Sequence, residues 1–111
     1  MVLHEVFQLL KSIKAVASES EFARDWLGRS ECYLRSVRFN RSEPSVATIA
    51  ICASKLQHYG RILLGQRQHR WIGERFLTLS ERCHQQINLK SRAAWLKDLG
   101  AQDAALPALD S

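Results

Sequence analysis

The chain has 111 residues, 46% of them hydrophobic and 24% charged, so it can bury one core, or one core with an appendage. Its formal net charge of +5 favours polyanionic partners without naming one. The N-terminus lacks the pattern of a signal peptide, and no window approaches the ~20 apolar residues of a membrane span. We therefore expect a cytoplasmic protein without a membrane segment.

Cysteine and histidine usage argues against several classes of site. Cys32, Cys52 and Cys83 are odd in number and widely spaced, which supports neither a disulfide framework nor a zinc site. The four histidines are scattered, and the sequence contains no glycine-rich phosphate loop, paired carboxylates or nucleophile elbow. These observations predict reduced thiols and a protein that is not an enzyme and holds no cofactor or metal.

The N-terminal third predicts two helices that are followed by a glycine turn. Apolar residues at helical spacing place the first helix at about 2 to 15. Ser18 and Glu21 have the arrangement of a capping box, so a second helix should start at Ser18 and run through Leu27. Gly28 can then adopt the left-handed conformation that commonly follows a helix.

A third helix is predicted at about 30 to 40, with Ser30 as its N-cap. Leu34 and Val37 should point inward, whereas the side that bears Arg35 and Arg38 should face outward together with Glu31. Between residues 29 and 41 the chain carries four arginines against this one glutamate. More than half of the net charge therefore falls in one short segment.

The C-terminal half predicts further helices. Pro44 and Ser45 should open a fourth helix that runs to Leu56, with breaks at Gly60 and Gly65. A fifth helix is expected at 67 to 89 and a short sixth at 91 to 99. The fifth helix carries an apolar stripe that must meet the N-terminal core or a second chain: Ile72, Phe76, Leu79, Cys83 and Ile87. Residues 100–111 should form a flexible tail.

Residues 3 to 57 resemble the lambda repressor and Cro type of helix-turn-helix domain, found in small bacterial and phage regulators. The matching features are Ser20 to Ala23 in the first helix of the motif, Leu27 and Gly28 at the turn, Ser30 to Val37 in the recognition helix, and Pro44 to Val46 at the start of the next helix. One departure is that Gly28 stands five positions after Ala23, where the family has a step of four. The resemblance implies an all-α fold with a helix-turn-helix domain of four to five helices at 1–60 and an amphipathic helical extension at 61–99.

The resemblance also implies sequence-specific binding of double-stranded DNA, with the helix at 30–40 in the major groove. Arg35 and Arg38 are candidates to read bases, because a guanidinium can donate to O6 and N7 of guanine together. The residues that flank this helix would meet phosphates, and the start of the preceding helix could add contacts to the DNA backbone. The full candidate set is Ser18, Ser20, Arg29, Ser30, Glu31, Arg35, Arg38 and Arg41.

The leading interpretation is a homodimeric transcriptional repressor. The alternative is a protein-binding adaptor or anti-activator built on the same scaffold, because function belongs to the surface and not to the fold. The arginines could also be an ordinary solvated helix face, and Trp26 and Tyr33 are interpreted as core residues. The observation that discriminates between DNA binding and the adaptor is whether Arg35 and Arg38 lie on an open basic face, are held in ion pairs, or are covered by the fifth helix.

Overall fold

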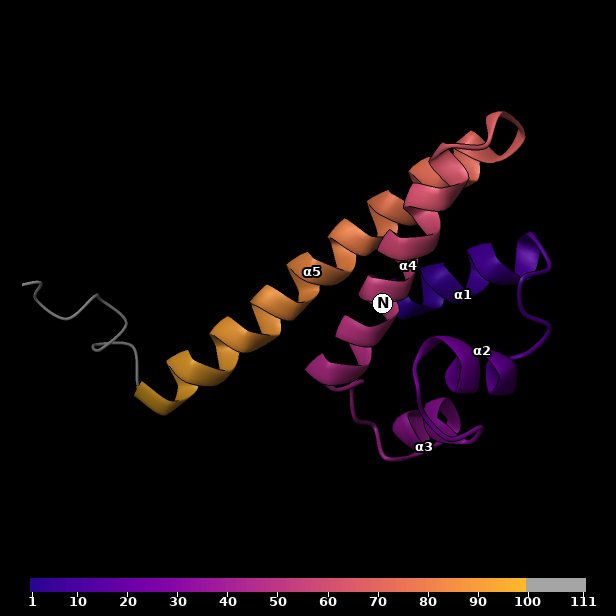
Figure 1. Ribbon diagram of the computed structural model, residues 1–111. Coiled ribbons are helices and arrows are strands. Elements are labelled where there is room, and N and C mark those ends of the chain that lie inside the picture. The colour runs from indigo at the N-terminus through magenta and orange to yellow at the C-terminus, as the bar shows by residue number, and fades with distance from the viewer. Residues whose placement is uncertain (100–111) are drawn as a thin grey trace, which may run out of the picture.

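The computed structural model describes residues 1–99, and these residues form the all-helical fold that the sequence predicts (Figure 1). Its elements are α1 (Val2–Ser12), α2 (Glu19–Trp26), α3 (Tyr33–Phe39), α4 (Val46–Leu64), a single 3-10 turn η1 (Arg67–His69) and α5 (Arg70–Leu99). The described part of the chain contains no strand, and none of its helices is long and apolar enough to cross a membrane. The tail expected at 100–111 lies outside the described residues.

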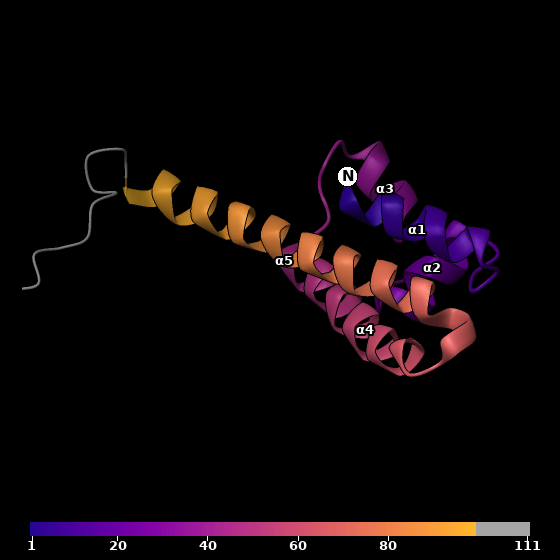
Figure 2. The same cartoon turned by 90° about the horizontal axis from the view of Figure 1, so that it is seen from above.

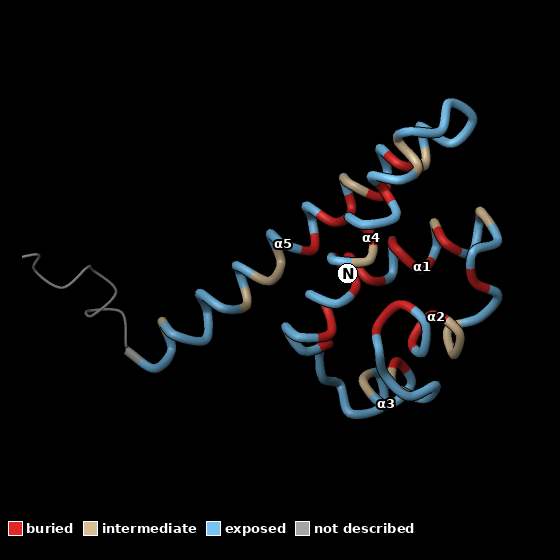
Figure 3. Tube along the Cα trace, in the orientation of Figure 1, coloured by how far each residue is buried: buried red, intermediate tan, exposed pale blue. Residues whose placement is uncertain are grey.

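The long helices α4 and α5 form an antiparallel hairpin, and α1, α2 and α3 gather beside it (Figures 1 and 2). At 1.5 Å per residue, α5 with 30 residues is about 45 Å long, whereas α4 with 19 residues is about 28 Å long. The C-terminal part of α5 therefore continues past the start of α4 and stands apart from the other helices. Figure 3 shows that this projecting part is largely exposed.

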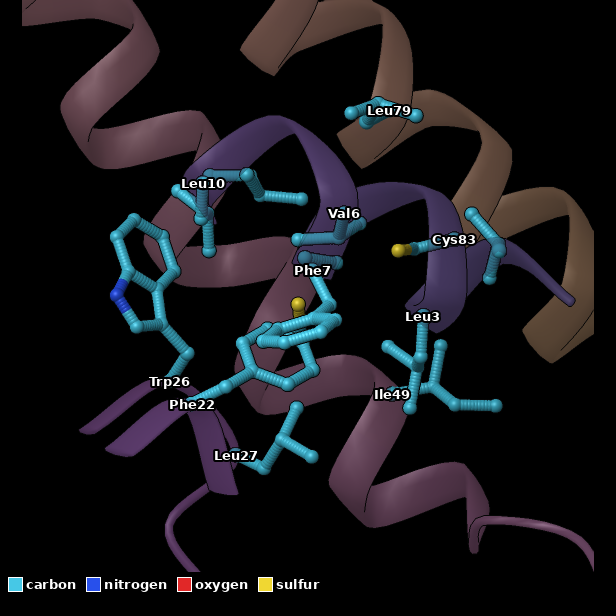
Figure 4. Packing of buried hydrophobic residues seen from close by; sticks show 14 of the residues in the cluster. Leu3, Val6, Phe7, Leu10, Phe22, Trp26, Leu27, Ile49, Leu79 and Cys83 are labelled. Carbon is cyan, nitrogen blue, oxygen red and sulfur yellow. The ribbon is translucent and has the colours of Figure 1, made fainter. Parts of the chain in front are cut away.

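One hydrophobic core joins α1, α2, α4 and α5 (Figures 3 and 4). The rings of Phe7 and Phe22 pack with their centroids 5.5 Å apart, and Trp26 meets Phe76 edge to face at 5.9 Å. The residues expected to share a core are buried, except that Val37 is only half-buried. The buried members of that set are Phe22, Ala23, Leu34, Ile49 and Leu56.

The apolar stripe of α5 faces this core. Phe76, Leu79 and Cys83 are buried, and Ile72 and Ile87 pack partly buried against the same cluster. Of the two expected outcomes for this stripe, burial against the N-terminal core is the one observed. The stripe therefore gives no reason to invoke a second chain.

Gly60 does not break a helix, and here the sequence prediction was wrong. Gly60 lies inside α4, where a Cβ atom would come within 2.9 Å of the Leu77 side chain. On the facing helix, a Cβ atom at Gly73 would lie 2.8 Å from the Gly60 carbonyl oxygen and 2.7 Å from the Leu64 amide nitrogen. The two glycines allow α4 and α5 to approach closely near the turn. The predicted break at Gly65 is confirmed, since α4 ends there.

Other boundaries also differ from the predictions. The helices expected at 67–89 and 91–99 are one continuous helix, because no glycine or proline occurs between Gly73 and Gly100 to interrupt it. The first helix ends at Ser12 and not near 15. The domain boundary expected at residue 60 falls inside α4, whose buried residues pack in the same core as those of α5.

Candidate functional site

The start of α2 is capped as the sequence predicts. The Ser18 hydroxyl accepts a hydrogen bond from the Glu21 amide at 3.2 Å. The Glu21 carboxylate reaches back to the amide of Ala17, at 2.9 Å, one residue before the cap. Because the Ser18 hydroxyl satisfies an amide of its own helix and acidic residues crowd this first turn, the N-terminus of α2 is a poor place for a phosphate.

The connection from α2 to α3 is longer than the predicted turn. Gly28 has the expected positive φ of 66°, and the next amide, of Arg29, donates to the Ala23 carbonyl at 3.0 Å. Ser30 does not cap α3, however: its carbonyl accepts from the Tyr33 amide, and the helix begins only at Tyr33 with Cys32 as its N-cap. Six residues, 27–32, therefore join the two helices, and α3 has only seven residues.

Arg29 joins this connection to α4. Its guanidinium donates to the Thr48 hydroxyl at 2.9 Å and to the Ser45 hydroxyl at 3.1 Å, and it lies 5.2 Å from the centroid of the Tyr33 ring. The Tyr33 hydroxyl in turn accepts from the Ser45 amide at 3.2 Å and contacts the Thr48 hydroxyl. We call Arg29, Tyr33, Ser45 and Thr48 the polar cluster. It holds α3 against the start of α4, so Arg29, although exposed, is engaged by other side chains of the protein and does not project as a free cation.

Arg38 is held in an exposed ion pair. Its guanidinium forms two hydrogen bonds with the Glu19 carboxylate, at 2.6 and 2.9 Å. This contact lowers the pKa of Glu19, because the hydrogen-bonded guanidinium favours the charged carboxylate. Glu31 is paired with Arg24 of α2 at 3.0 Å. Both pairs are open to solvent, so neither is a strong constraint and each can exchange for another partner.

Four of the predicted residues meet around one surface depression between α2 and α3. This depression, of about 530 Å³, is lined among others by Ser18, Ser20, Glu31 and Arg35. Arg29, Ser30, Arg38 and Arg41 are not among its lining residues. Since the carboxylates of Glu19 and Glu31 also face it, the depression itself is not a purely basic site.

The outward side of α3 carries side chains that the sequence analysis did not single out. Arg35, Ser36, Phe39 and Asn40 are all exposed, and they line a shallow surface depression together with Cys32. Phe39 is 88% exposed, although it is aromatic. The signal was present in the sequence, since residues 32, 35, 36 and 39 fall on the side of a helix opposite Leu34.

Of the two predicted base-reading residues, Arg35 is the one that no carboxylate of the described residues pairs with. Its only polar contact within the described chain is to the Cys32 sulfur, at 3.1 Å. Arg41, two residues after the end of α3, has a positive φ of 51°, a conformation that side-chain-bearing residues seldom adopt. Two residues later, Glu43 is paired with Lys90 of α5 at 2.6 Å, so the segment after α3 is tied to the long helix.

The other polar groups of note among the described residues are candidate metal ligands and the cysteine thiols. No group of three histidine, cysteine or acidic residues there could hold a metal ion. Cys52 and Cys83 are both buried between α4 and α5, and the hydrogen bond to Cys83, together with burial, raises the pKa of Cys52. Neither thiol is placed to act on a bound molecule.

Comparison with known families gives one match. The model of a family of unknown function, DUF6626, matches residues 3–96, which cover α1 to α4 and nearly all of α5. The chain belongs to this family. No curated protein and no solved structure matches it. The family model therefore spans the described helices as one unit.

Proposed function

We propose that this DUF6626 protein binds double-stranded DNA in the cytoplasm, with the outward side of α3 in the major groove. The observation that carries the proposal is that this side bears four exposed residues, Arg35, Ser36, Phe39 and Asn40. The helix itself lies at the edge of the molecule (Figures 1 and 3). Arginine can read guanine, asparagine can read adenine, serine can bond to either, and phenylalanine can meet the thymine methyl group. A single face therefore combines four kinds of base contact.

The surroundings of α3 support this role. The polar cluster fixes α3 against α4, and a base-reading helix has to be held in one orientation to discriminate between sequences. Arg38 is paired with Glu19 on the surface, so it can exchange the carboxylate for DNA at little cost. The seven-residue α3 is short, and we accordingly place the contacts on its outward face and on Arg41 just beyond its end.

The proposal is tested first with a pool of random-sequence DNA duplexes, from which bound molecules are selected and sequenced. We expect an enriched motif, and Arg35→Ala should then cost ~1–3 kcal/mol on that motif and much less on random DNA. Arg61→Ala, at an exposed position near the other end of α4, is the matched control and should bind like the wild type. Absence of binding at low salt would overturn the proposal.

Phosphate contact by Arg41 has its own signature. Arg41→Gly removes the charge and also suits the positive φ at this position, so loss of binding cannot be attributed to unfolding. We expect weaker binding to all sequences and a slope of log affinity against log salt that is smaller by about one unit. Lys14→Gly, which removes a cation at the other positive-φ position, should leave the slope unchanged.

A second function, the binding of a protein partner, is favoured by Phe39. An aromatic side chain that is 88% exposed next to arginines has the composition of a protein-binding hot spot. Under this adaptor function Phe39→Ala would abolish capture of the partner, whereas Arg35→Ala would have no sequence-dependent effect on DNA. Under DNA binding, Phe39→Ala should weaken only sites that contain a contacted thymine.

Self-association belongs to the same proposal. A homodimer would let two α3 helices read half-sites about 34 Å apart on one side of the duplex, and the selected DNA motif would then be a palindrome. Sedimentation of the protein with and without that DNA tests this. A monomer that binds a single unrepeated site would leave DNA binding intact and remove the dimer.

A further inference from the structure

Another surface depression, of about 600 Å³, opens beside α4, and none of its lining residues lies on the outward face of α3; we call it the cavity. Its walls come from the loop after α1, from the end of α2, from α4 and from Phe76 of α5. Pockets that hold small ligands usually enclose ~300–1,000 Å³ and combine apolar walls with a few polar groups. This cavity has that size and that composition.

The apolar part of the cavity is aromatic. The Trp26 ring lies 5.6 Å from the Tyr59 ring and 5.9 Å from the Phe76 ring, measured between centroids, and all three line the cavity. Figure 4 shows the indole nitrogen of Trp26 on the side of the ring turned away from the other labelled core residues. Tyr59 is 44% exposed and Ile62 is 48% exposed, so an incoming molecule meets these two side chains first, with the buried rings of Trp26 and Phe76 behind them.

The charges that line the cavity are not balanced. Arg24 is paired with both Asp25 and Glu31, and the Asp25 carboxylate is occupied by Arg24. Lys55 has no carboxylate partner in the described part of the chain; its ammonium contacts only the backbone carbonyl of Asp25. That contact uses one of the three ammonium donors, so two remain for a ligand.

We infer that this cavity binds a small organic anion, with an aromatic or aliphatic body against Trp26, Tyr59 and Phe76 and a carboxylate on Lys55. Stacking on the aromatic wall and a charge-assisted hydrogen bond to the ammonium of Lys55, a half-buried residue, would supply the affinity. The site shares no residue with the outward face of α3, and the inference does not depend on DNA binding.

The test uses Trp26 as a reporter. The double variant Trp71→Phe, Trp95→Phe replaces two exposed tryptophans and leaves Trp26 as the only indole in the chain. Naphthoate and its neutral amide, which has the same shape, are the probes, and nitrogen–proton NMR follows the single indole signal. We expect naphthoate to shift this signal in a saturable way and to bind about tenfold more tightly than the amide, the size of one charge-assisted hydrogen bond.

Two variants locate the site. Lys55→Met keeps the aliphatic stem and removes the charge, so it should lower the affinity for naphthoate about tenfold and leave the amide unaffected. Lys97→Met, on the projecting part of α5, is the matched control and should change neither. Ala15→Leu fills part of the cavity from an exposed loop position and should weaken both probes, while circular dichroism confirms that the fold is retained.

The inference is overturned if millimolar naphthoate leaves the Trp26 signal unmoved. Equal affinity for the acid and the amide would overturn the anionic part of it. A dimer in sedimentation that Ile62→Ser converts to a monomer would show that a second copy covers the cavity, and this too would overturn the ligand site.

Discussion

The α4–α5 hairpin and the α2–α3 segment (residues 19–39) are held in place by different kinds of interaction. In the hairpin, long helices bury apolar side chains and approach closely where Gly60 and Gly73 face each other. In the α2–α3 segment, helices of eight and seven residues are shorter than the ~12–15 residues that an isolated helix needs. Apolar anchors such as Phe22 and Leu34 and the polar cluster therefore decide whether and where these short helices form.

This difference separates stability from function. Changes in the hairpin should alter the free energy of unfolding of the whole protein, because both helices contribute to the only core of the described residues. Changes on the outward face of α3 should alter binding and leave stability nearly unchanged, because those side chains are exposed.

The largest expected effect is that of truncating the hairpin core. Leu79 is 2% exposed, so Leu79→Ala should lower the free energy of unfolding by ~2–5 kcal/mol through lost burial and a residual cavity. Urea denaturation measures this. Leu89→Ala, in the same helix but at a residue that is 65% exposed, should change it by no more than ~0.5 kcal/mol, and equal effects at both positions would contradict the placement of α5.

The next effect concerns the close approach of the two long helices. Gly73→Ala would place a methyl group against backbone atoms of α4, which cannot move aside as a flexible side chain can, and should cost ~1–3 kcal/mol. Gly65→Ala is the control, because its Cβ would meet only ordinary contact at 3.4 Å. If thermal denaturation finds Gly73→Ala as stable as the wild type, the two helices do not pack as closely as described.

A smaller effect is expected in the polar cluster. Arg29→Ala removes two hydrogen bonds to α4 and should lower the free energy of unfolding by about 1 kcal/mol, since the guanidinium remains partly hydrated. Arg35→Ala is the matched control and should not destabilise the protein. If Arg35→Ala lowered the free energy of unfolding more than Arg29→Ala, the distinction between a structural Arg29 and a surface Arg35 would be wrong.

The smallest effect is the pH dependence of the ion pair on α2 and α3. The pKa of Glu19 is lowered in the folded protein by its hydrogen bond to Arg38. The stabilisation is therefore fully present above the unfolded value of about 4.5, and it is lost as the pH falls through the lower folded value. An NMR titration of the Glu19 carboxyl should show a midpoint below that value in the wild type and a return toward it in Arg38→Ala.

Local signals in the sequence predicted much of the fold. The Ser18 and Ser45 caps, the left-handed Gly28 and the buried stripe of α5 all depend on neighbouring residues or on helical period. The predicted start of α3 at Ser30 was wrong. Ser30 is a good capping residue, but it accepts the hydrogen bond of the Tyr33 amide with its carbonyl and not with its hydroxyl. The predicted break at Gly60 was also wrong. Glycine has a low helix propensity, and the sequence alone does not show the facing helix against which Gly60 packs.

For the candidate site, the sequence by itself determined the types of side chain and their order along a helix. Because Leu34 is the buried residue of α3, helical period places Arg35 on the exposed side, as expected. Only the tertiary structure decided which of these charged side chains are available: Arg29 donates to Thr48, Arg38 is paired with Glu19, and Glu31 is paired with Arg24. These partners stand seven to nineteen residues away in the chain. Helical period relates only residues three or four positions apart, so pairings across such separations depend on how the helices pack.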